Sequence, residues 1–487
     1  METMASDSGG ADDRISDLPD HILHTILLRL RDIAAAARTS ALSRRWRRVW
    51  PHLPELCFPF RCAAGVYTCW SESDKHRRRV DAALAAHAAP AVALLDIALP
   101  RWVPAHPQQY PEDPDRDDPL LRFLASRRVA GELRLTLRGG WHDVVLPPCE
   151  RATAISLYFN GPVLRFQQPL PGGAGSGAFA ALASLRIKRT RVDARELGEV
   201  LFSRCPSLKE LFLKRITLKD QDNNVLSIRS DSLERLEMEM CVGFDARVEV
   251  FAPRMKIFVS RRISSGDARI VAPRLLELCW HGSFDPARHD LGEAGYHLQR
   301  LEIAKNSPAA QLIRQFCSIH ELQLTLQVWK GIDEYDRYLQ LINRLSTCQV
   351  LVVGFVVTQH AIKPVMLQFL NKCVGVKKIV MRSLGHRMDK CQCKLWECQC
   401  DGSKQSPKID ETALRLLELV EIKEDMEAYH KVKLVKLLCE YSAGFQKRVT
   451  ITVIENKQSV REKICNIRAP NDKVVINVNV RTTQAET

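Results

Sequence analysis

A short apolar pattern recurs along the middle of this chain and constrains its fold. Leu-x-x-Leu, followed after one more residue by Ile, Leu or Met, begins at residues 182, 208, 233 and 298, and a variant with Ile first begins at 319. Successive clear copies stand mostly about 20 to 30 residues apart. Alternate side chains of a strand face opposite sides, so each copy predicts a short strand whose leucines point inward. The sequence therefore predicts stacked strand-containing repeats.

Two internal features support a repeat. Val250-Phe-Ala-Pro-Arg-Met255 and Ile270-Val-Ala-Pro-Arg-Leu275 are nearly the same hexamer, one repeat apart. Asp193 can cap a helix that stops before Pro206, between two predicted strands. Pattern and period together are those of leucine-rich repeats, in which strands alternate with helices or turns and each unit contacts its neighbours.

Further elements follow from weaker signals. Copies of the strand pattern are expected near Ala130 and Ala152, and a helix over Ile362–Cys373 precedes a strand that begins at Val376. The segments between or before the repeats are an Ala-rich stretch, a Pro- and Asp-rich loop and a Gly-rich loop, at residues 81–99, 100–119 and 171–177.

The first sixty residues show a different spacing. Leu18, Ile22, Ile26 and Leu30 recur every four residues with Leu23 and Leu27 beside them, which predicts a helix with a wide apolar stripe. Ser16 or Asp17 can cap its start, and Pro19 suits the first turn. A second segment places Leu42, Trp46, Val49 and Trp50 on one face, with Arg44, Arg45, Arg47 and Arg48 around the rest. Short helices with this much apolar surface need a partner.

Residues 12–56 resemble a plant-type F-box. The resemblance lies in the Asp-Leu-Pro-Asp motif at residues 17–20 and in the apolar and tryptophan positions that follow it. The resemblance implies docking onto the Skp-type adaptor of a cullin-based ubiquitin ligase. Its adaptor-facing set would be Leu18, Pro19, Ile22, Ile26, Leu27, Leu30, Trp46 and Trp50. In the alternative interpretation, these side chains pack against the repeats that follow.

The C-terminal segment predicts strand, helix and strand over Leu416–Ile422, Ala428–Tyr441 and Arg448–Val453, with Val432, Val435 and Leu438 of the helix inward. It resembles the FBD module that closes many plant F-box and leucine-rich-repeat proteins, although charged residues replace the usual glycine-bearing link. As one more repeat, it would cap the open end of the array. The weak alternation at Val474–Val480 predicts an edge strand or a disordered tail.

The predicted fold class is thus α/β: a helical F-box, then a leucine-rich-repeat α/β solenoid closed by an FBD-like capping unit. The predicted boundaries are 12–56 for the F-box, 57–120 for the Ala-rich segment and connecting loop, 121–385 for the solenoid, 386–410 for a Cys-rich loop, 411–456 for the FBD-like module and 457–487 for a C-terminal strand or tail.

Composition limits the partners. The formal charge of +14 could favour nucleic acid, but the basic residues are dispersed and lack interleaved aromatics, which favours a solvated face. The N-terminus does not look like a signal peptide, and the longest apolar run, Val350–Val357, is too short to span a membrane. Sixteen cysteines spread over a long chain suit reduced thiols in the nucleus or cytoplasm.

Four thiols, Cys391, Cys393, Cys398 and Cys400, lie within ten residues. Structural zinc sites normally leave two to four residues within each Cys pair, whereas one residue stands within each pair here. A flexible surface loop is therefore favoured, and a zinc clip stays open as the alternative. Motifs for zinc hydrolysis, phosphate loops and nucleophile elbows are not found in the sequence, so we expect neither an enzyme nor a cofactor.

The favoured function is that of the substrate-recognition subunit of an SCF-type ligase, with the F-box on a Skp-type adaptor, cullin beyond it and an unknown protein target on the repeats. The residues predicted to face the target are Arg186, Phe212, Glu237, Glu302 and Gln323, with Val259, Cys279 and Val380 at equivalent positions. Their mixed sign and size argue against a phosphate-tracking groove. A basic nucleic-acid-binding scaffold and an adaptor-binding protein without a ubiquitination target remain the alternatives.

Overall fold

The computed structural model of this chain describes residues 18–60, 70–99, 119–126, 128–138, 143–160, 162–167, 179–218, 225–241, 247–261, 266–282, 284–295, 297–304, 312–313, 316, 319–328, 348–357, 366, 369–385 and 414–480. The chain divides into two compact units. The first is Met1–Leu233 with Cys241–Gly243, and the second is Glu234–Met240 with Phe244–Thr487. No helix among the described residues is long and apolar enough to cross a membrane.

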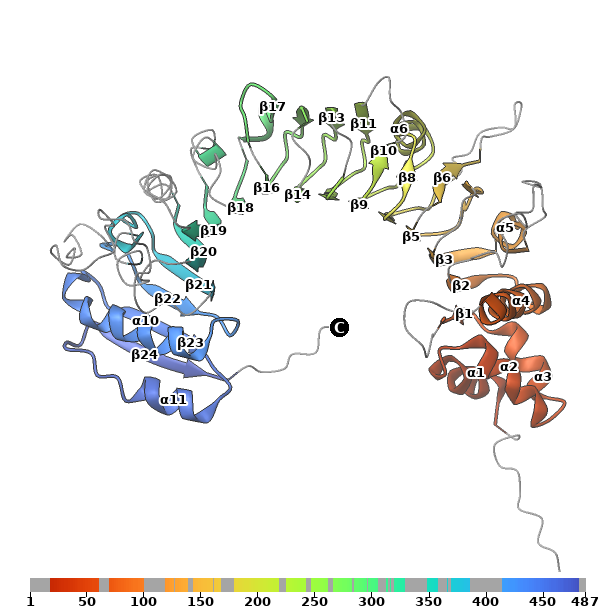
Figure 1. The fold of residues 1–487 in the computed structure, drawn as a ribbon, viewed down its shortest axis with the longest axis horizontal. Helices are drawn as coiled ribbons and strands as arrows, with labels where there is room; N and C mark the ends of the chain where they lie inside the picture. The colour runs from red at the N-terminus through yellow and green to blue at the C-terminus, as the bar shows by residue number, and fades with distance from the viewer. Residues whose placement is uncertain are drawn as a thin grey trace, which may run out of the picture. The chain divides into compact units, whose positions relative to one another are not determined.

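The first unit begins with a group of short helices, drawn in red in Figure 1. They are α1 (Asp20–Arg29), α2 (Ile33–Arg38), η1 (Thr39–Ala41), α3 (Trp46–Val49) and η2 (Trp50–His52). Their core consists of side chains at most 3% exposed: Leu23, Leu27, Ile33, Trp46 and Val49. Pro19 occupies the N-cap of α1 and provides no side-chain hydrogen bond. The expected caps at residues 16 and 17 lie outside the described residues.

The main sheet of the first unit has six parallel strands in the order β1-β2-β3-β5-β7-β9. They are β1 (Glu55–Phe58), β2 (Val92–Leu99), β3 (Val129–Arg138), β5 (Ala154–Asn160), β7 (Ser184–Lys188) and β9 (Glu210–Lys214). Their register aligns one apolar residue from each strand into a ladder at most 1% exposed: Leu56, Leu95, Leu133, Ile155, Leu185 and Leu211. The predicted strands with inward leucines are therefore confirmed, as are the weaker copies near residues 130 and 152.

The strand order begins earlier than the predicted start of the repeats at residue 121. β1 starts at Glu55, inside the predicted F-box range, and β2 lies in the segment predicted as Ala-rich connection. Both carry the repeat pattern, as Leu53-x-x-Leu56-x-Phe58 and Val92-x-x-Leu95-x-Ile97. Gly131 permits the close approach of β3 to β2, because a Cβ at this residue would lie 2.1 Å from the carbonyl oxygen of Ala93.

Helices and a second set of short strands complete the first unit. The helices are α4 (Trp70–Ala86), α5 (Pro119–Ala125) and α6 (Ala194–Ser203). The short parallel strands are β4 (Val144–Leu146), β6 (Val163–Phe166), β8 (Arg191–Val192) and β10 (Thr217–Leu218), and β11 (Val225–Arg229) packs against α6. Figure 1 shows β6, β8, β10 and α6 on the same side of β5 and β9.

The helix predicted after residue 193 is confirmed as α6. The Asp193 side chain accepts a hydrogen bond of 2.9 Å from the backbone N–H of Glu196, which makes it the N-cap. The buried side chains of α6 include Leu197, Val200 and Leu201.

The main sheet of the second unit continues the same design with ten parallel strands. In spatial order they are β12 (Arg235–Glu239), β14 (Ile257–Arg261), β16 (Glu277–His281), β18 (Arg300–Ala304), β19 (Glu321–Val328), β20 (Val350–Val357), β21 (Lys378–Gly385), β22 (Leu419–Ile422), β23 (Val449–Ile454) and β24 (Val474–Asn479). The remaining elements are β13 (Arg247–Phe251), β15 (Ala268–Val271), β17 (His289–Asp290), η3 (Gly292–Gly295), α10 (Ala428–Glu440), η5 (Ser442–Gly444) and α11 (Gln458–Cys465).

Backbone hydrogen bonds to a shared carbonyl oxygen join successive repeats in the second unit. The Glu234 carbonyl accepts hydrogen bonds from the backbone N–H groups of Lys256 and Ile257, and the Lys256 carbonyl accepts from Leu276 and Glu277 in the next repeat. The two related hexamers lie in this region. Val250 of β13 pairs in parallel with Ile270 of β15, and each hexamer continues into a turn with a fully buried alanine. The internal duplication in sequence is therefore a duplication in structure.

The C-terminal strand, helix and strand are present as β22, α10 and β23, and β24 pairs in parallel with β23. Of the two predictions for residues 474–480, the edge strand is confirmed; α11 was not predicted. The second unit has its own buried apolar ladder, which includes the paired Val420 of β22 and Ile451 of β23, both fully buried. This ladder ends at β24, since Ile476, the partner of Ile451, is half-buried. The last strand of the described array is thus β24 rather than the second strand of the FBD-like segment.

The inward face of α10 differs from the prediction. Val435 and Leu438 are buried, but Val432 is half-buried and Lys431 is 2% exposed. The ammonium group of Lys431 donates to Glu455 Oε2 at 2.9 Å and to the carbonyl oxygen of Ile454 at 2.8 Å. A buried ion pair therefore joins α10 to the end of β23.

Several predicted segments lie outside the described residues. They are most of the Pro- and Asp-rich loop, the Gly-rich loop, the Cys-rich loop with all four of its thiols, and much of the helix predicted over 362–373.

Candidate functional site

Helix α1 has one face in the core and one on the surface. Leu23 and Leu27 are 0% and 2% exposed and pack inward. Ile22, Ile26 and Leu30 are 37%, 39% and 45% exposed. Residues four apart lie on the same face of a helix, so these three side chains form one apolar row, which we call the α1 row.

The predicted adaptor-facing set divides between this row and the core. Besides the α1 row, Pro19 is exposed, and Leu18 and Trp50 are half-buried. Leu27 and Trp46 are 2% and 3% exposed, so their placement on the adaptor-facing surface was wrong. Both side chains instead lie in the buried core of the helix group, in which α1 contacts α3. Leu42, 67% exposed, was outside the predicted set and adds apolar surface.

Polar contacts fix the position of α1. The guanidinium of Arg45 donates to Asp20 Oδ1 at 2.6 Å and to the carbonyl oxygen of Leu18. His24 Nε2 lies 3.2 Å from the carbonyl oxygen of Val49. These contacts join the first helix to the last, so the α1 row is held on a defined support.

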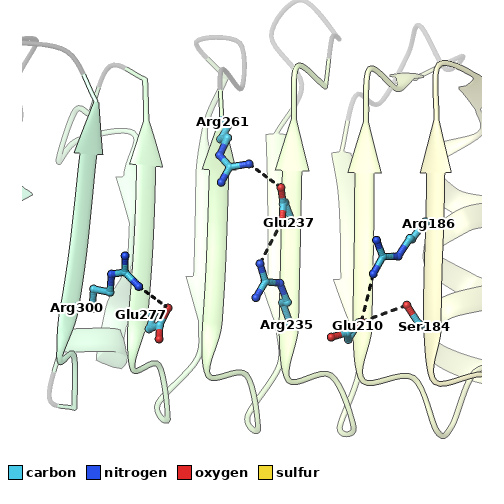
Figure 2. A network of polar contacts seen from close by, with 8 residues as sticks. All are labelled: Ser184, Arg186, Glu210, Arg235, Glu237, Arg261, Glu277 and Arg300. Carbon is cyan, nitrogen blue, oxygen red and sulfur yellow. Dashed lines mark hydrogen bonds and ion pairs between the residues drawn. The ribbon is translucent and has the colours of Figure 1, made fainter. Parts of the chain in front are cut away.

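In the first unit, the sheet face opposite the leucine ladder carries polar and aromatic side chains. The guanidinium of Arg186 lies 4.1 Å from the centre of the Phe212 ring, within the range of a cation–π contact. Glu210 accepts a hydrogen bond of 3.3 Å from Ser184 and lies 3.9 Å from Arg186, as Figure 2 shows. Arg186 is exposed and Phe212 half-buried, so both predicted positions are accessible.

In the second unit, ion pairs lie along and across the strands of the same kind of face. Glu237 accepts from Arg261 at 2.9 Å and from Arg235 at 3.4 Å (Figure 2). Arg300 lies 3.8 Å from Glu277 and 3.3 Å from Glu321, and donates to Gln323 Oε1 at 3.0 Å. Glu237, Glu302 and Gln323 are half-buried on this face. Much of the basic charge here is therefore compensated locally.

Three of the eight equivalent positions do not face solvent. Val259, Cys279 and Val380 are 6%, 6% and 5% exposed, so the expectation that they present to a partner was wrong. Their neighbours explain the burial. Val259 lies in register between Glu237 and Cys279, next to the Glu237–Arg261 pair, and Val380 lies beside Glu421, which pairs with two lysines. Long charged side chains cover small apolar ones.

Cys279 lies next to a histidine–carboxylate pair on this face. His281 Nε2 is 2.9 Å from Glu302 Oε1 and 3.2 Å from Cys279 Sγ. The hydrogen bond from His281 is the main cause of a lowered pKa at Glu302, whereas burial raises the pKa of the Cys279 thiol to about 12. The repeat spacing places Cys279 and Glu302 on this face but does not predict their contact, since contact between adjacent strands depends on register.

Known proteins resemble this chain both in its N-terminal helices and over longer stretches. Residues 15–57 match the F-box domain. Three similar proteins come from Arabidopsis thaliana. One named as an FBD-associated F-box protein is 26% identical over 232 residues, which are 46% of this chain and 49% of that protein. An F-box/FBD/LRR-repeat protein is 32% identical over 248 residues, 47% of this chain and 50% of that protein. F-box/LRR-repeat protein 13 is 27% identical over 403 residues, 77% and 78% of the two chains.

The chain spans about half the length of the FBD-type relatives that it matches. The F-box match covers the helices that carry the α1 row, and the longest of these alignments extends over both units. The N-terminal helices of this chain are therefore an F-box, and the chain is a relative of plant F-box/LRR-repeat proteins with an FBD-like region.

Proposed function

We propose that this chain is the substrate-recognition subunit of an SCF-type cullin ubiquitin ligase. In this proposal its F-box docks a Skp-type adaptor, which connects it to cullin, and its repeats hold a protein target. The chain itself needs no reacting group, since a bound target is brought to a high effective concentration near the ubiquitin carrier.

The observation that carries the proposal is the α1 row. Ile22, Ile26 and Leu30 are each more than a third exposed on a helix whose opposite face is buried. Contiguous apolar surface on a well-packed helix is typical of a protein interface. The match of residues 15–57 to the F-box domain supports a Skp-type adaptor as the partner of that interface.

The α1 row can be tested by introducing charge without disturbing the core. We expect Ile22→Asp/Ile26→Asp to abolish co-purification of the adaptor, because two carboxylates would lose water in an apolar contact at a cost of several kcal/mol. Phe202→Asp is the matched control: Phe202 is 67% exposed but lies on α6, outside the F-box. It should leave adaptor binding unchanged. If the double variant stays folded by circular dichroism and still retains the adaptor, the proposed docking surface is wrong.

We further propose that the strands form a leucine-rich-repeat solenoid and that β22, α10 and β23 belong to its FBD-like closing unit. The parallel order within each unit and the buried apolar ladder support this architecture. The target would bind the polar face of the main sheet within a unit: the candidate residues are Arg186 and Phe212 in the first unit, and Glu237, Glu302 and Gln323 in the second.

The target face can be tested with the target stabilised. We expect affinity purification under proteasome inhibition to recover proteins that are lost with Arg186→Glu/Phe212→Asp but kept with the Phe202→Asp control. Recovery of the adaptor should be equal for all three chains. Equal recovery of every other protein as well would place target binding elsewhere.

A nucleic-acid-binding scaffold is the second candidate, motivated by net charge. The paired arginines of the sheet face weigh against it, since Arg235, Arg261 and Arg300 each contact a carboxylate. Charges already compensated within the protein release few counterions on binding a phosphate backbone.

A further inference from the structure

Three potential metal ligands meet on the sheet face of the second unit. Cys279 and His281 come from β16 and Glu302 from β18, and their ligand atoms all lie within 4.8 Å of one another. Among the residues that the structure describes, this is the one such group of His, Cys, Asp and Glu.

Strand geometry brings the three together. Residues two apart on a strand point to the same face, so Cys279 and His281 share one. The parallel register of β16 and β18 pairs Cys279 with Glu302. Two adjacent, hydrogen-bonded strands therefore fix the backbone of all three residues, which is the rigid support that a metal site needs.

The contacts around His281 place its Nε2 next to both other potential ligands. Its Nε2 lies 2.9 Å from Glu302 Oε1 and 3.2 Å from Cys279 Sγ. Without a metal, hydrogen bonds satisfy this cluster, since His281 and the Cys279 thiol both hydrogen-bond Glu302. A metal ion on Nε2 would instead bind the lone pairs of nitrogen, oxygen and thiolate together.

We propose that Cys279, His281 and Glu302 bind a zinc ion. Thiolate, imidazole and carboxylate are all zinc ligands, whereas magnesium and calcium select oxygen. Tetrahedral zinc with its usual bond lengths holds S and N about 3.6 Å apart and N and O about 3.3 Å apart. His281 Nε2 would therefore have to move about 0.4 Å farther from Cys279 Sγ and from Glu302 Oε1 to admit the ion.

The surroundings define the kind of site. His281 and Glu302 are 22% and 23% exposed, so solvent reaches these two ligands. The fourth zinc ligand is then a water molecule or a side chain of a bound target. Arg261 hydrogen-bonds Cys279 and is also held 2.9 Å from Glu237, so zinc binding would replace its contact with the sulfur while the Glu237 pair remains. None of the proposed zinc ligands lies in the F-box, so the zinc proposal does not depend on adaptor docking.

Cobalt substitution tests the site in the full-length chain. After removal of metal with a chelator, we expect Co²⁺ to bind with the visible bands of tetrahedral cobalt and a near-ultraviolet thiolate-to-cobalt band, and Zn²⁺ to displace it at about one ion per chain. Cys279→Ser should remove the thiolate band. His281→Ala and Glu302→Gln should weaken zinc binding at least about tenfold, measured against a chromophoric chelator.

Matched controls keep the ligands and remove similar groups. Cys465→Ser and His297→Ala alter an exposed thiol and an exposed imidazole in the same unit and should leave binding unchanged. A quadruple Cys→Ser change at residues 391, 393, 398 and 400 should also retain the cobalt spectrum.

Two results would overturn the proposal. One is the absence of stoichiometric cobalt or zinc binding to the full-length chain. The other is a thiolate band that survives Cys279→Ser and disappears in the quadruple variant, which would assign the metal to the Cys-rich loop. Adaptor co-purification by the same variants reports on the F-box alone, so failure of the zinc site and failure of the proposed function are distinguishable.

Discussion

The buried pair of Lys431 and Glu455 gives a quantitative prediction for the C-terminal unit. The two side chains are 2% and 8% exposed, and the ammonium also donates to the Ile454 carbonyl oxygen. Removing one partner of a buried ion pair leaves a charge without compensation, which costs about 3 to 5 kcal/mol. We expect Glu455→Gln to lower the free energy of local unfolding by about 3 kcal/mol, near the bottom of that range because the carbonyl contact remains.

Hydrogen exchange of the full-length chain measures this effect locally. Amides of α10 and β23 should exchange more than about a hundredfold faster in Glu455→Gln, since each 1.4 kcal/mol corresponds to a factor of ten. The double variant Lys431→Met/Glu455→Gln should recover most of the loss, because no charge stays buried.

An exposed pair in the same unit provides the control. Lys447 and Glu418 form an ion pair in which both side chains are 50% exposed. Lys447→Met should change local stability by no more than about 1 kcal/mol. If Glu455→Gln costs as little as Lys447→Met, the reasoning from burial is refuted.

The pH dependence of the same pair follows from its contacts. Burial alone would raise the pKa of Glu455, but hydrogen bonds from the Lys457 amide and from Lys431 outweigh it and the pKa is lowered. The pair therefore stabilises the fold above the unfolded-state pKa of about 4.3 and loses this contribution as the pH falls toward the lower folded-state value. Protection of α10 should decline over that interval, and the decline should be absent in Glu455→Gln.

Three further predictions concern other parts of the chain. Asp193→Ala should destabilise α6 by about 1 kcal/mol in hydrogen exchange, whereas Asp193→Asn, which keeps a capping oxygen, should change little; equal effects would contradict the capping assignment. Gly131→Ala should cost about 1 to 3 kcal/mol in urea unfolding, because its Cβ would meet the Ala93 carbonyl oxygen at 2.1 Å, and a neutral result would mean that β2 and β3 can separate easily. Binding to labelled DNA should be weak, independent of sequence and lost near physiological salt; sequence-selective binding there would favour the scaffold alternative.

The spacing of apolar residues predicted the strands because a strand buries every second side chain, and this burial is what selects the apolar residues at those positions. Leu185, Leu211 and Leu236 were identified by spacing alone and lie in the buried ladders. The copies in β1 and β2 carry the same pattern but were missed, since they lie beside or within segments read from the F-box resemblance and from alanine content. The cap of α6 was predictable because it depends on residues three apart.

Features that depend on neighbouring strands were not predictable from one chain segment. Burial of Val259 requires the Glu237–Arg261 pair across the adjacent strand, and the contact of Cys279 with Glu302 requires the register of β16 and β18. Leu27 and Trp46 were misplaced for a similar reason. A wide apolar stripe indicates that part of it is buried in the helix group and part is left for another protein. Which residues fall in each part depends on how the other helices pack against the stripe.

The joint between the two related hexamers shows how such chains can diverge. The connection consists of backbone hydrogen bonds from Leu276 and Glu277 to the Lys256 carbonyl oxygen and of the fully buried Ala252 and Ala272. None of the side chains on the polar sheet face takes part in it. Recombination between two copies would therefore recreate the same joint, with one repeat gained or lost. Selection could then change the length and the exposed residues of the array independently, so new specificities could arise without redesign of the core.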